Sequence, residues 1–153
     1  MASKRRLPQT GLLGRRTPPP EPVIRAHRKA KNTTPQKPSH LLLQIDHFPN
    51  PVTTIGCAIQ EHLILGRSDP TSAIQVDIDL TEYHAAEYGV SRRHVEIVRK
   101  DNALWVHDLG SRNGTFLNDE PIGSELVRLQ DGDTLILGGL VITIWFVFAE
   151  DHS

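Results

Sequence analysis

One stretch, DLGSRNGTFLN at residues 108–118, decides how the chain is organised. Apolar and polar residues alternate before it and again after it, which is the pattern of half-buried strands. Asn113-Gly114 predicts a tight turn, because both residue types tolerate a positive φ. The turn does not account for Ser111 and Arg112, which add a hydroxyl and a guanidinium to the same bend. Loops on a rigid β scaffold often carry binding residues, so this stretch is also a candidate site.

Short strand patterns extend in both directions from this stretch. Before it, we predict strands at 41–46, 52–59, 62–65, 76–80, 94–98 and 103–109. After it, we predict strands at 116–117, 121–122, 125–129, 134–137 and 140–148. Turn-forming residues separate these segments, and 52–59 is expected to pair with 62–65 as a hairpin. About eleven short strands with almost no helix indicate an all-β sandwich.

Residues 71–90 interrupt the strand rhythm with one short helical insert. Residues 81–88 have the composition of one to two helical turns. Thr81 suits the N-cap, Glu82 suits the positive N-terminal end, and Gly89 suits the C′ position.

The first 39 residues differ in composition from the rest of the chain. Ten of the 17 Lys and Arg residues precede residue 41, against Glu21 as the only acid there. Seven of the 11 prolines fall within residues 1–38, where no apolar periodicity is visible. Such a segment cannot bury enough surface to offset its ordering entropy, so we predict a disordered, extended arm. The predicted organisation is an arm at 1–39, a sandwich domain at 40–149 and a short tail at 150–153.

Several classes of function fit the sequence poorly. Cys57 is the only cysteine, which excludes an intrachain disulfide and favours a reducing, cytoplasmic setting. No signal-peptide pattern is present, and the longest apolar region, 135–149, is shorter than the roughly 18 residues of a membrane span. The eight histidines show no paired ligand spacing, so neither a metal nor a cofactor is expected. Ser91, His94 and Asp108 are residue types of a triad, but Ser-x-x-His matches no nucleophile arrangement, so no enzyme is predicted.

Three polar clusters stand at the ends of predicted strands: Gly66-Arg67, 91–94 and 110–114. Loops gather at the two ends of a sandwich, so clusters that share an end would bring together up to four arginines and two serines. Arginine's planar fork suits phosphate, and serine hydroxyls and loop N–H groups add donors. A site made of donors, with no base beside a nucleophile, favours binding an anion over breaking a bond.

The blocks in this order resemble a forkhead-associated (FHA) domain. They are Gly-Arg, then Ser-Arg-x-His, then Asp-Leu-Gly-Ser-x-Asn-Gly-Thr-Phe-Leu-Asn, then Leu-x-Asp-Gly-Asp-x-Leu-x-Leu-Gly, and they cover roughly residues 41–149. Four separate blocks in order make the resemblance specific, and the chain resembles a small, single-domain member of bacterial type. The resemblance implies an eleven-stranded β-sandwich whose end loops bind phosphothreonine in partner proteins.

The resemblance also implies roles for the matching residues. Arg67 would pair with the phosphate, Ser91 would hydrogen-bond it, and Arg92 would add a second phosphate contact. Asn113 would bond the ligand backbone beside the phosphothreonine. Arg112 stands at a variable position that in some members reaches the phosphate or nearby ligand residues. Structural support is implied for four further residues, with loops held by Gly66 and His94 and the turn shaped by Gly114 and Asn118.

The implied function is a non-catalytic, phosphothreonine-dependent protein-binding module in Ser/Thr kinase signalling. Its partner would be a phosphothreonine-containing protein, such as a Ser/Thr kinase or a kinase substrate. An arm threonine is a further candidate ligand, because Thr17 and Thr34 precede prolines and Thr10 lies nearby. Once phosphorylated, one of them could occupy the domain's own site or that of a second copy. The 71–90 insert is longer than a minimal member of the family needs.

Two other functions stay open. The domain could keep these loops and act as a phospho-independent scaffold. The basic arm could bind nucleic acid or an acidic surface non-specifically. A solvated linker is the simpler interpretation of the arm, so nucleic acid is not the favoured partner, and no membrane partner is expected.

Overall fold

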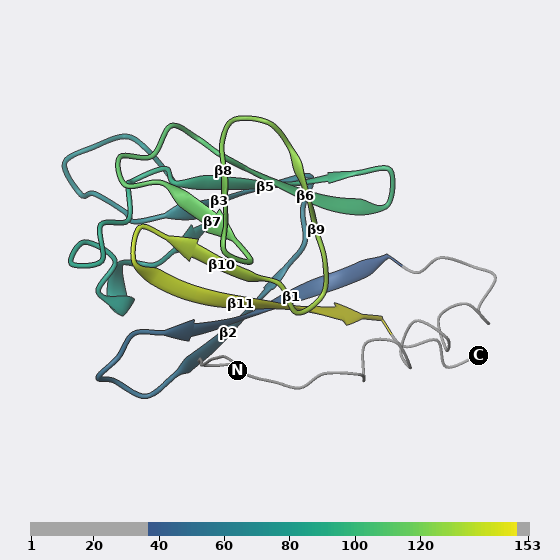
Figure 1. Ribbon diagram of the computed structural model, residues 1–153, viewed down its shortest axis with the longest axis horizontal. Helices are drawn as coiled ribbons and strands as arrows, with labels where there is room; N and C mark the ends of the chain where they lie inside the picture. The colour runs from purple at the N-terminus through teal and green to yellow at the C-terminus, as the bar shows by residue number, and fades with distance from the viewer. Residues whose placement is uncertain (1–36, 150–153) are drawn as a thin grey trace, which may run out of the picture. The chain divides into compact units, whose positions relative to one another are not determined.

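Residues 37–149 are the part of the chain that the computed structural model describes, and they form two stacked β-sheets (Figure 1). One sheet has six strands in the order β2-β1-β11-β10-β7-β8, and the other has five in the order β4-β3-β5-β6-β9. Every neighbouring pair is antiparallel except β3–β4. The predicted all-β sandwich of about eleven strands is confirmed. The strands are β1 (Pro38–Asp46), β2 (Thr53–Ala58), β3 (His62–Gly66), β4 (Ile78–Asp79), β5 (Val95–Lys100), β6 (Ala103–Asp108), β7 (Thr115–Leu117), β8 (Glu120–Ile122), β9 (Val127–Leu129), β10 (Thr134–Leu137) and β11 (Leu140–Phe148).

Alternating burial along the strands explains why this sequence forms a sandwich. In β1, Leu41, Leu43 and Ile45 are fully buried while the residues between them are exposed. In β6 of the other sheet, Leu104 and Val106 are buried in the same way. Because side chains alternate between faces along a strand, each sheet turns one apolar face inward. Each fully buried Leu or Ile side chain contributes roughly 1.5–3 kcal/mol by leaving water.

The first strand begins slightly earlier than the sequence predicted. β1 starts at Pro38, whereas a strand was expected from residue 41 and the domain from residue 40. The register gives the reason, because Pro38 pairs with Phe148 and β1 therefore runs along the full length of β11. The tail at 150–153 and nearly all of the predicted disordered arm lie outside the described residues, so both stay predictions.

The predicted hairpin between 52–59 and 62–65 is wrong. β2 pairs with β1, where Ile55 lies opposite Leu43, while β3 pairs with β5, where Leu63 lies opposite Ile97. The two strands therefore belong to different sheets, and the short link between them crosses the sandwich. A short turn between two apolar runs looks the same in sequence whether the strands pair or cross.

The insert before β5 is less regular than predicted. The expected strand at 76–80 is reduced to β4, and the helix is a single 3-10 turn, η1 (Thr81–Tyr83), with Leu80 rather than Thr81 at the N-cap. The Thr81 hydroxyl instead donates to Asp79 Oδ1 at 2.5 Å, a local bond that competes with helix capping. His84 ends the turn in the left-handed region, so Gly89 is not the helix C′ residue, although its φ is +83°. Within the described residues, no helix is long and apolar enough to cross a membrane.

Candidate functional site

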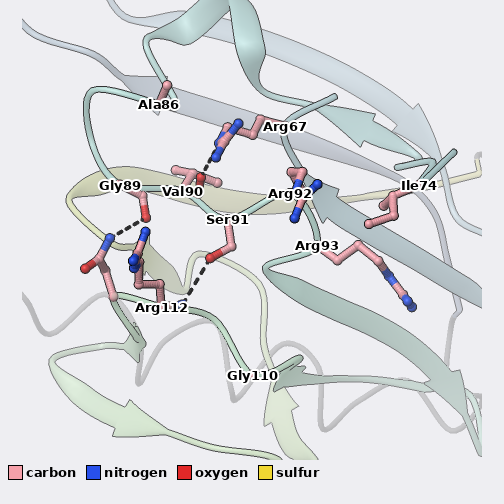
Figure 2. A pocket seen from close by; sticks show the side chains of 11 residues that line it. Arg67, Ile74, Ala86, Gly89, Val90, Ser91, Arg92, Arg93, Gly110 and Arg112 are labelled. Carbon is pink, nitrogen blue, oxygen red and sulfur yellow. Dashed lines mark hydrogen bonds between the residues drawn. The ribbon is translucent and has the colours of Figure 1, made fainter. Parts of the chain in front are cut away.

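A pocket of about 530 Å³ opens where three loops meet: the loop after β3, the insert before β5 and the loop between β6 and β7 (Figure 2). Four of its lining residues are arginines, and none is acidic. The three polar clusters of the sequence are therefore brought together. The lining residues are Arg67, Ile74, Ala86, Gly89, Val90, Ser91, Arg92, Arg93, Gly110, Arg112 and Asn113.

Gly66 allows two of these loops to approach each other. A Cβ at this buried glycine would lie 2.0 Å from the carbonyl oxygen of Arg92 and 2.9 Å from that of Ser91. Both obstacles are backbone atoms, which cannot swing aside as a flexible side chain can. The close approach brings the loop that carries Ser91 against the end of β3, next to Arg67.

His94 ties the same loop to the β6–β7 loop. Its ring is fully buried, with Nδ1 accepting the N–H of Ser91 at 3.0 Å and Nε2 lying 2.9 Å from the Gly114 carbonyl oxygen. An amide N–H can only donate and a carbonyl can only accept, so the ring is neutral and carries its proton on Nε2. Burial lowers the pKa of His94, against the opposing effects of the Gly114 bond and of Asp108.

Asp108 organises the start of the β6–β7 loop. Its Oδ1 accepts the N–H groups of Gly110 and Ser111, both at 2.7 Å. Its Oδ2 accepts the hydroxyls of Ser111 and Thr115, both at 2.6 Å. Burial alone would raise the pKa of Asp108, but the bonds from Ser111, Thr115 and Gly110 outweigh it and hold that pKa below its usual value. The Ser111 hydroxyl in turn accepts the N–H of Gly114 at 2.9 Å, so Ser111 is a structural residue of the loop.

Asn113 joins the β6–β7 loop to the insert. Its Nδ2 donates to the Gly89 carbonyl oxygen at 2.9 Å. A Cβ on Gly89 would lie 2.5 Å from the same Nδ2, and the positive φ of Gly89 also disfavours a side chain there. Asn113 is exposed, so the rest of its amide faces the pocket opening.

The pocket arginines stand on three loops: Arg67 follows β3, Arg92 and Arg93 precede β5, and Arg112 lies between β6 and β7. Arg67 donates from Nε to the Val90 carbonyl oxygen at 2.7 Å, which orients its guanidinium (Figure 2). The hydroxyl of Ser91 accepts the backbone N–H of Arg112 at 3.0 Å. Arg92 lies 3.4 Å from Asp69, measured from Nη1 to Oδ2. These arginines and the serine hydroxyl surround a space suited to an anion with several acceptor oxygens.

The structure places all five predicted ligand contacts on the pocket wall: Arg67, Ser91, Arg92, Arg112 and Asn113. Gly66 lies against the backbone of Ser91 and Arg92, and His94 bonds Ser91 and Gly114. Asn118 instead bonds Asp133 and Thr134 at the turn between β7 and β8. Its contribution is to that turn and not to the pocket.

Some residues of the site were not found from sequence. Asp108 was considered only as a triad residue, although an Asp two residues before a Gly-Ser pair is a local signal for a side chain that caps the loop. Ile74 and Ala86 line the pocket without carrying any local signal, because the folding of the insert brings them there. Arg93 belongs to the predicted polar cluster at 91–94, but it was given no role of its own. The triad geometry is absent, since His94 bonds the backbone of Ser91 and not its hydroxyl. No cluster of three or more metal-ligating side chains occurs among residues 37–149.

The model of the FHA domain family matches residues 63–138. The chain belongs to the FHA domain family. Solved FHA domains support the assignment. An FHA domain solved in a study of phosphothreonine-dependent FHA domain interactions has a TM-score of 0.51 and 28% identity, covering 69% of this chain and 95% of that one. An FHA domain of a Chlamydia trachomatis protein has a TM-score of 0.54 and 25% identity, covering 75% of this chain and 100% of that one.

Three curated proteins are similar to part of this FHA domain protein. The oxoglutarate dehydrogenase inhibitor of Corynebacterium diphtheriae is 49% identical over 49 residues, covering 32% of this chain and 33% of the relative. The glycogen accumulation regulator GarA of Mycobacterium tuberculosis is 45% identical over 49 residues, covering 32% and 29%. Protein FraH of a Nostoc species is 35% identical over 82 residues, covering 52% and 28%. The chain thus spans about a third or less of the length of each of these relatives.

Proposed function

We propose that this FHA domain binds phosphothreonine-containing proteins through the arginine-lined pocket. One observation carries the proposal: four of the seven basic residues after residue 40 line one pocket, on a segment with seventeen acidic residues. A phosphothreonine brings about −1.5 to −2 charge and three acceptor oxygens, which match such a cluster of donors. The family and the phosphothreonine-dependent interactions studied in a related FHA domain support the same ligand.

The geometry supports a separate role for each phosphate contact. The Nε of Arg67 is held by Val90, which leaves its two terminal nitrogens for the phosphate oxygens. The Ser91 hydroxyl already accepts a bond from Arg112, so its own proton is available to donate to the phosphate. Arg92 shares its charge with Asp69 and adds a weaker contact.

Asn113 is proposed to contact the ligand backbone. Its bond to Gly89 fixes the amide in one orientation, with one N–H already used. The remaining amide donor and acceptor match the backbone C=O and N–H of an extended peptide. A peptide bonded there would run across the mouth of the pocket, with its phosphothreonine side chain reaching in.

The threonine methyl group has an exposed apolar neighbour available in Ala86, which lines the pocket. Val90 also lines the pocket but is only 2% exposed. One methyl group in such a site contributes about 1–3 kcal/mol, so we expect phosphothreonine to bind about tenfold or more tightly than phosphoserine.

The proposed partners follow from this ligand class. We place the protein in Ser/Thr kinase signalling, in the cytoplasm, with a phosphorylated kinase or kinase substrate as its partner. The related proteins named as an inhibitor and as a regulator agree with a binding function without catalysis. A phosphorylated arm threonine, Thr10, Thr17 or Thr34, is a further proposed ligand, and all three lie outside the described residues.

A peptide-binding experiment tests the proposal. Fluorescence polarisation would measure a phosphothreonine peptide library against wild type, Arg67→Ala and Asn113→Ala. We expect selective binding by wild type and a loss of at least tenfold in each variant, because each removes a contact made inside the pocket. Arg128→Ala is the matched control, since Arg128 is exposed, lies outside the pocket and stacks on Trp105. Equal binding of phosphorylated and unphosphorylated peptides would favour the phospho-independent scaffold instead.

A further inference from the structure

The edge strand β2 has a free side in its sheet. It pairs with β1 alone and forms one edge of the six-stranded sheet (Figure 1). Just beyond β2, the Ile59 N–H donates to the Ser39 carbonyl oxygen at 3.0 Å, which fixes the phase of the bonds to β1. Because antiparallel bonding alternates along a strand, the N–H and C=O groups of Thr54, Gly56 and Ala58 point away from β1. All three residues are exposed, and no other described segment pairs with them.

The other three sheet edges carry features that discourage pairing with another chain. β8 has three residues and contains Glu120 and Pro121, β9 has three residues and contains Arg128, and β4 has only two residues. Short length, charge and proline are the usual protections of an edge strand. β2 has six residues, Thr-Thr-Ile-Gly-Cys-Ala, with no charge and no proline. Among the described strands, β2 is therefore the edge best suited to receive another strand.

The side chains at this edge leave apolar surface uncovered on both faces of the sheet. On the inner face, Ile55 and Cys57 pack against the core but are only partly buried. On the outer face, Leu42 lies beside Gly56 and is 38% exposed. A strand added beyond β2 would remove part of this surface from water and would satisfy the outward backbone groups.

A second copy of β2 matches this edge. Antiparallel pairing with Gly56 opposite Gly56 places Thr54 opposite Ala58 in both directions, so every outward N–H and C=O finds a partner. The same register sets Ile55 opposite Cys57 of the other copy, which is an apolar pair. Two copies of an acidic segment would repel each other at most surfaces, but β2 is uncharged and sets no like charges opposite each other.

We propose that two copies of the chain associate by antiparallel pairing of their β2 strands, with Gly56 at the two-fold axis. The pairing would join the two six-stranded sheets into one continuous sheet. None of the β2 residues lines the arginine-lined pocket, so the association uses no phosphate contact and is separate from the proposed function. One strand pair buries less than the roughly 1,200 Å² of a stable interface, so we expect a weak dimer that forms at about 0.1–1 mM protein.

Matched charge variants test the dimer and its register together. Positions 54 and 58 lie opposite each other only between copies, because within one strand they are about 13 Å apart. Thr54→Glu/Ala58→Glu and Thr54→Lys/Ala58→Lys each set like charges opposite each other, whereas Thr54→Glu/Ala58→Lys sets opposite charges there. Sedimentation equilibrium of the full, unphosphorylated chain measures the dimer Kd, and without phosphate an arm threonine cannot link the copies through the pocket.

We expect the Glu/Lys variant to dimerise about fivefold or more tightly than either like-charged variant, since two cross-strand pairs change sign. The Lys/Lys variant is the control for net charge. It makes the chain less acidic, yet it should weaken the dimer as the Glu/Glu variant does. All three variants should bind a phosphothreonine peptide as wild type does, because the pocket is unchanged.

Hydrogen exchange gives an independent measurement at the backbone. The amides of Thr54, Gly56 and Ala58 should exchange more slowly as the full chain is concentrated through the dimer Kd. The amides of Ile55 and Cys57 are directed to β1 in the monomer, so their exchange should change little.

Three results would overturn the dimer. The first is a wild type that stays monomeric up to about 1 mM. The second is an equal Kd for the Glu/Lys, Glu/Glu and Lys/Lys variants, which would assign any association to another surface. The third is protection of the outward β2 amides at every concentration in a monomeric chain, which would mean that another segment of the same chain covers this edge.

Discussion

At the scale of single residues, Gly66 shows how a position without a side chain can decide the site. A Cβ at this position would clash with the carbonyl oxygen of Arg92, which is far away along the chain, so only glycine fits. Gly66→Ala should therefore push the two loops apart, destabilise the domain by about 2–4 kcal/mol and weaken phosphopeptide binding. Urea unfolding and peptide titration measure the two effects.

The matched control for this substitution is Gly123→Ala. A Cβ at Gly123 meets no atom within 4 Å, so the same chemical change should alter stability by less than about 1 kcal/mol. If Gly66→Ala were as benign as Gly123→Ala, the loop contact would not be what requires the glycine.

His94 gives a pH dependence whose sign follows from its bonds. Its folded pKa lies below the ordinary value of 6.5, so the unfolded chain takes up the proton first as the pH falls. The contribution of His94 to stability is therefore complete above pH 6.5 and is lost progressively below it. Protonation would also set an N–H on Nδ1 against the N–H of Ser91, which would break this bond and loosen the loop that carries Ser91.

NMR of the imidazole nitrogens checks this expectation directly. We expect the His94 ring to be neutral at pH 7 with its proton on Nε2, and to titrate below 6.5. A proton found on Nδ1, or a titration at or above 6.5, would contradict the bonding described for Ser91 and Gly114.

At the scale of the elements, the β6–β7 loop is built around one carboxylate. Asp108 accepts four hydrogen bonds, and an amide in its place has only one oxygen to accept them. Asp108→Asn should cost about 2–4 kcal/mol of stability and reduce phosphopeptide binding, because Arg112 and Asn113 lose their fixed positions. Thermal or urea unfolding with peptide titration is the measurement.

Asp119→Asn is a suitable comparison for that change. Asp119 is exposed in the turn between β7 and β8, and its positive φ of 71° is one that Asn adopts readily. We expect it to leave both stability and binding nearly unchanged. Equal effects of the two substitutions would show that the loop does not depend on the bonds of Asp108.

Features of the fold that depend on neighbouring residues could be predicted from the sequence. Features that depend on contacts between distant segments could not. The closing hairpin of β10 and β11 was predicted with its observed bounds, because the strands and the turn at Gly138 are contiguous. The pairing of β2 with β1 instead of β3 was not, since it depends on which sheet each strand joins. The five proposed ligand residues came from the resemblance to a family. Ile74 and Ala86 could not be predicted as pocket residues, because only the folding of the insert brings them to the pocket wall.

At the scale of the whole molecule, charge separates the chain into two parts with different expected ligands. Residues 1–36 hold nine basic side chains and one acid, whereas residues 37–153 hold eight basic and seventeen acidic side chains. A strongly acidic segment repels the phosphates of nucleic acid, and four of its basic residues are confined to one pocket. Any non-specific binding to DNA should therefore depend on residues 1–36, and phosphopeptide binding should not.

Removal of residues 1–36 separates these two activities, and β1, which begins at Pro38, stays intact. We expect the shortened chain to bind a phosphothreonine peptide with unchanged or higher affinity, because the pocket arginines all remain. Affinity would rise if a phosphorylated arm threonine competes for the pocket, and dephosphorylation of the full chain should then raise it equally. Salt-dependent binding to a short DNA duplex should disappear with the arm. A large loss of peptide affinity on removing residues 1–36 would mean that the arm helps to hold the ligand, and that the pocket alone does not make the site.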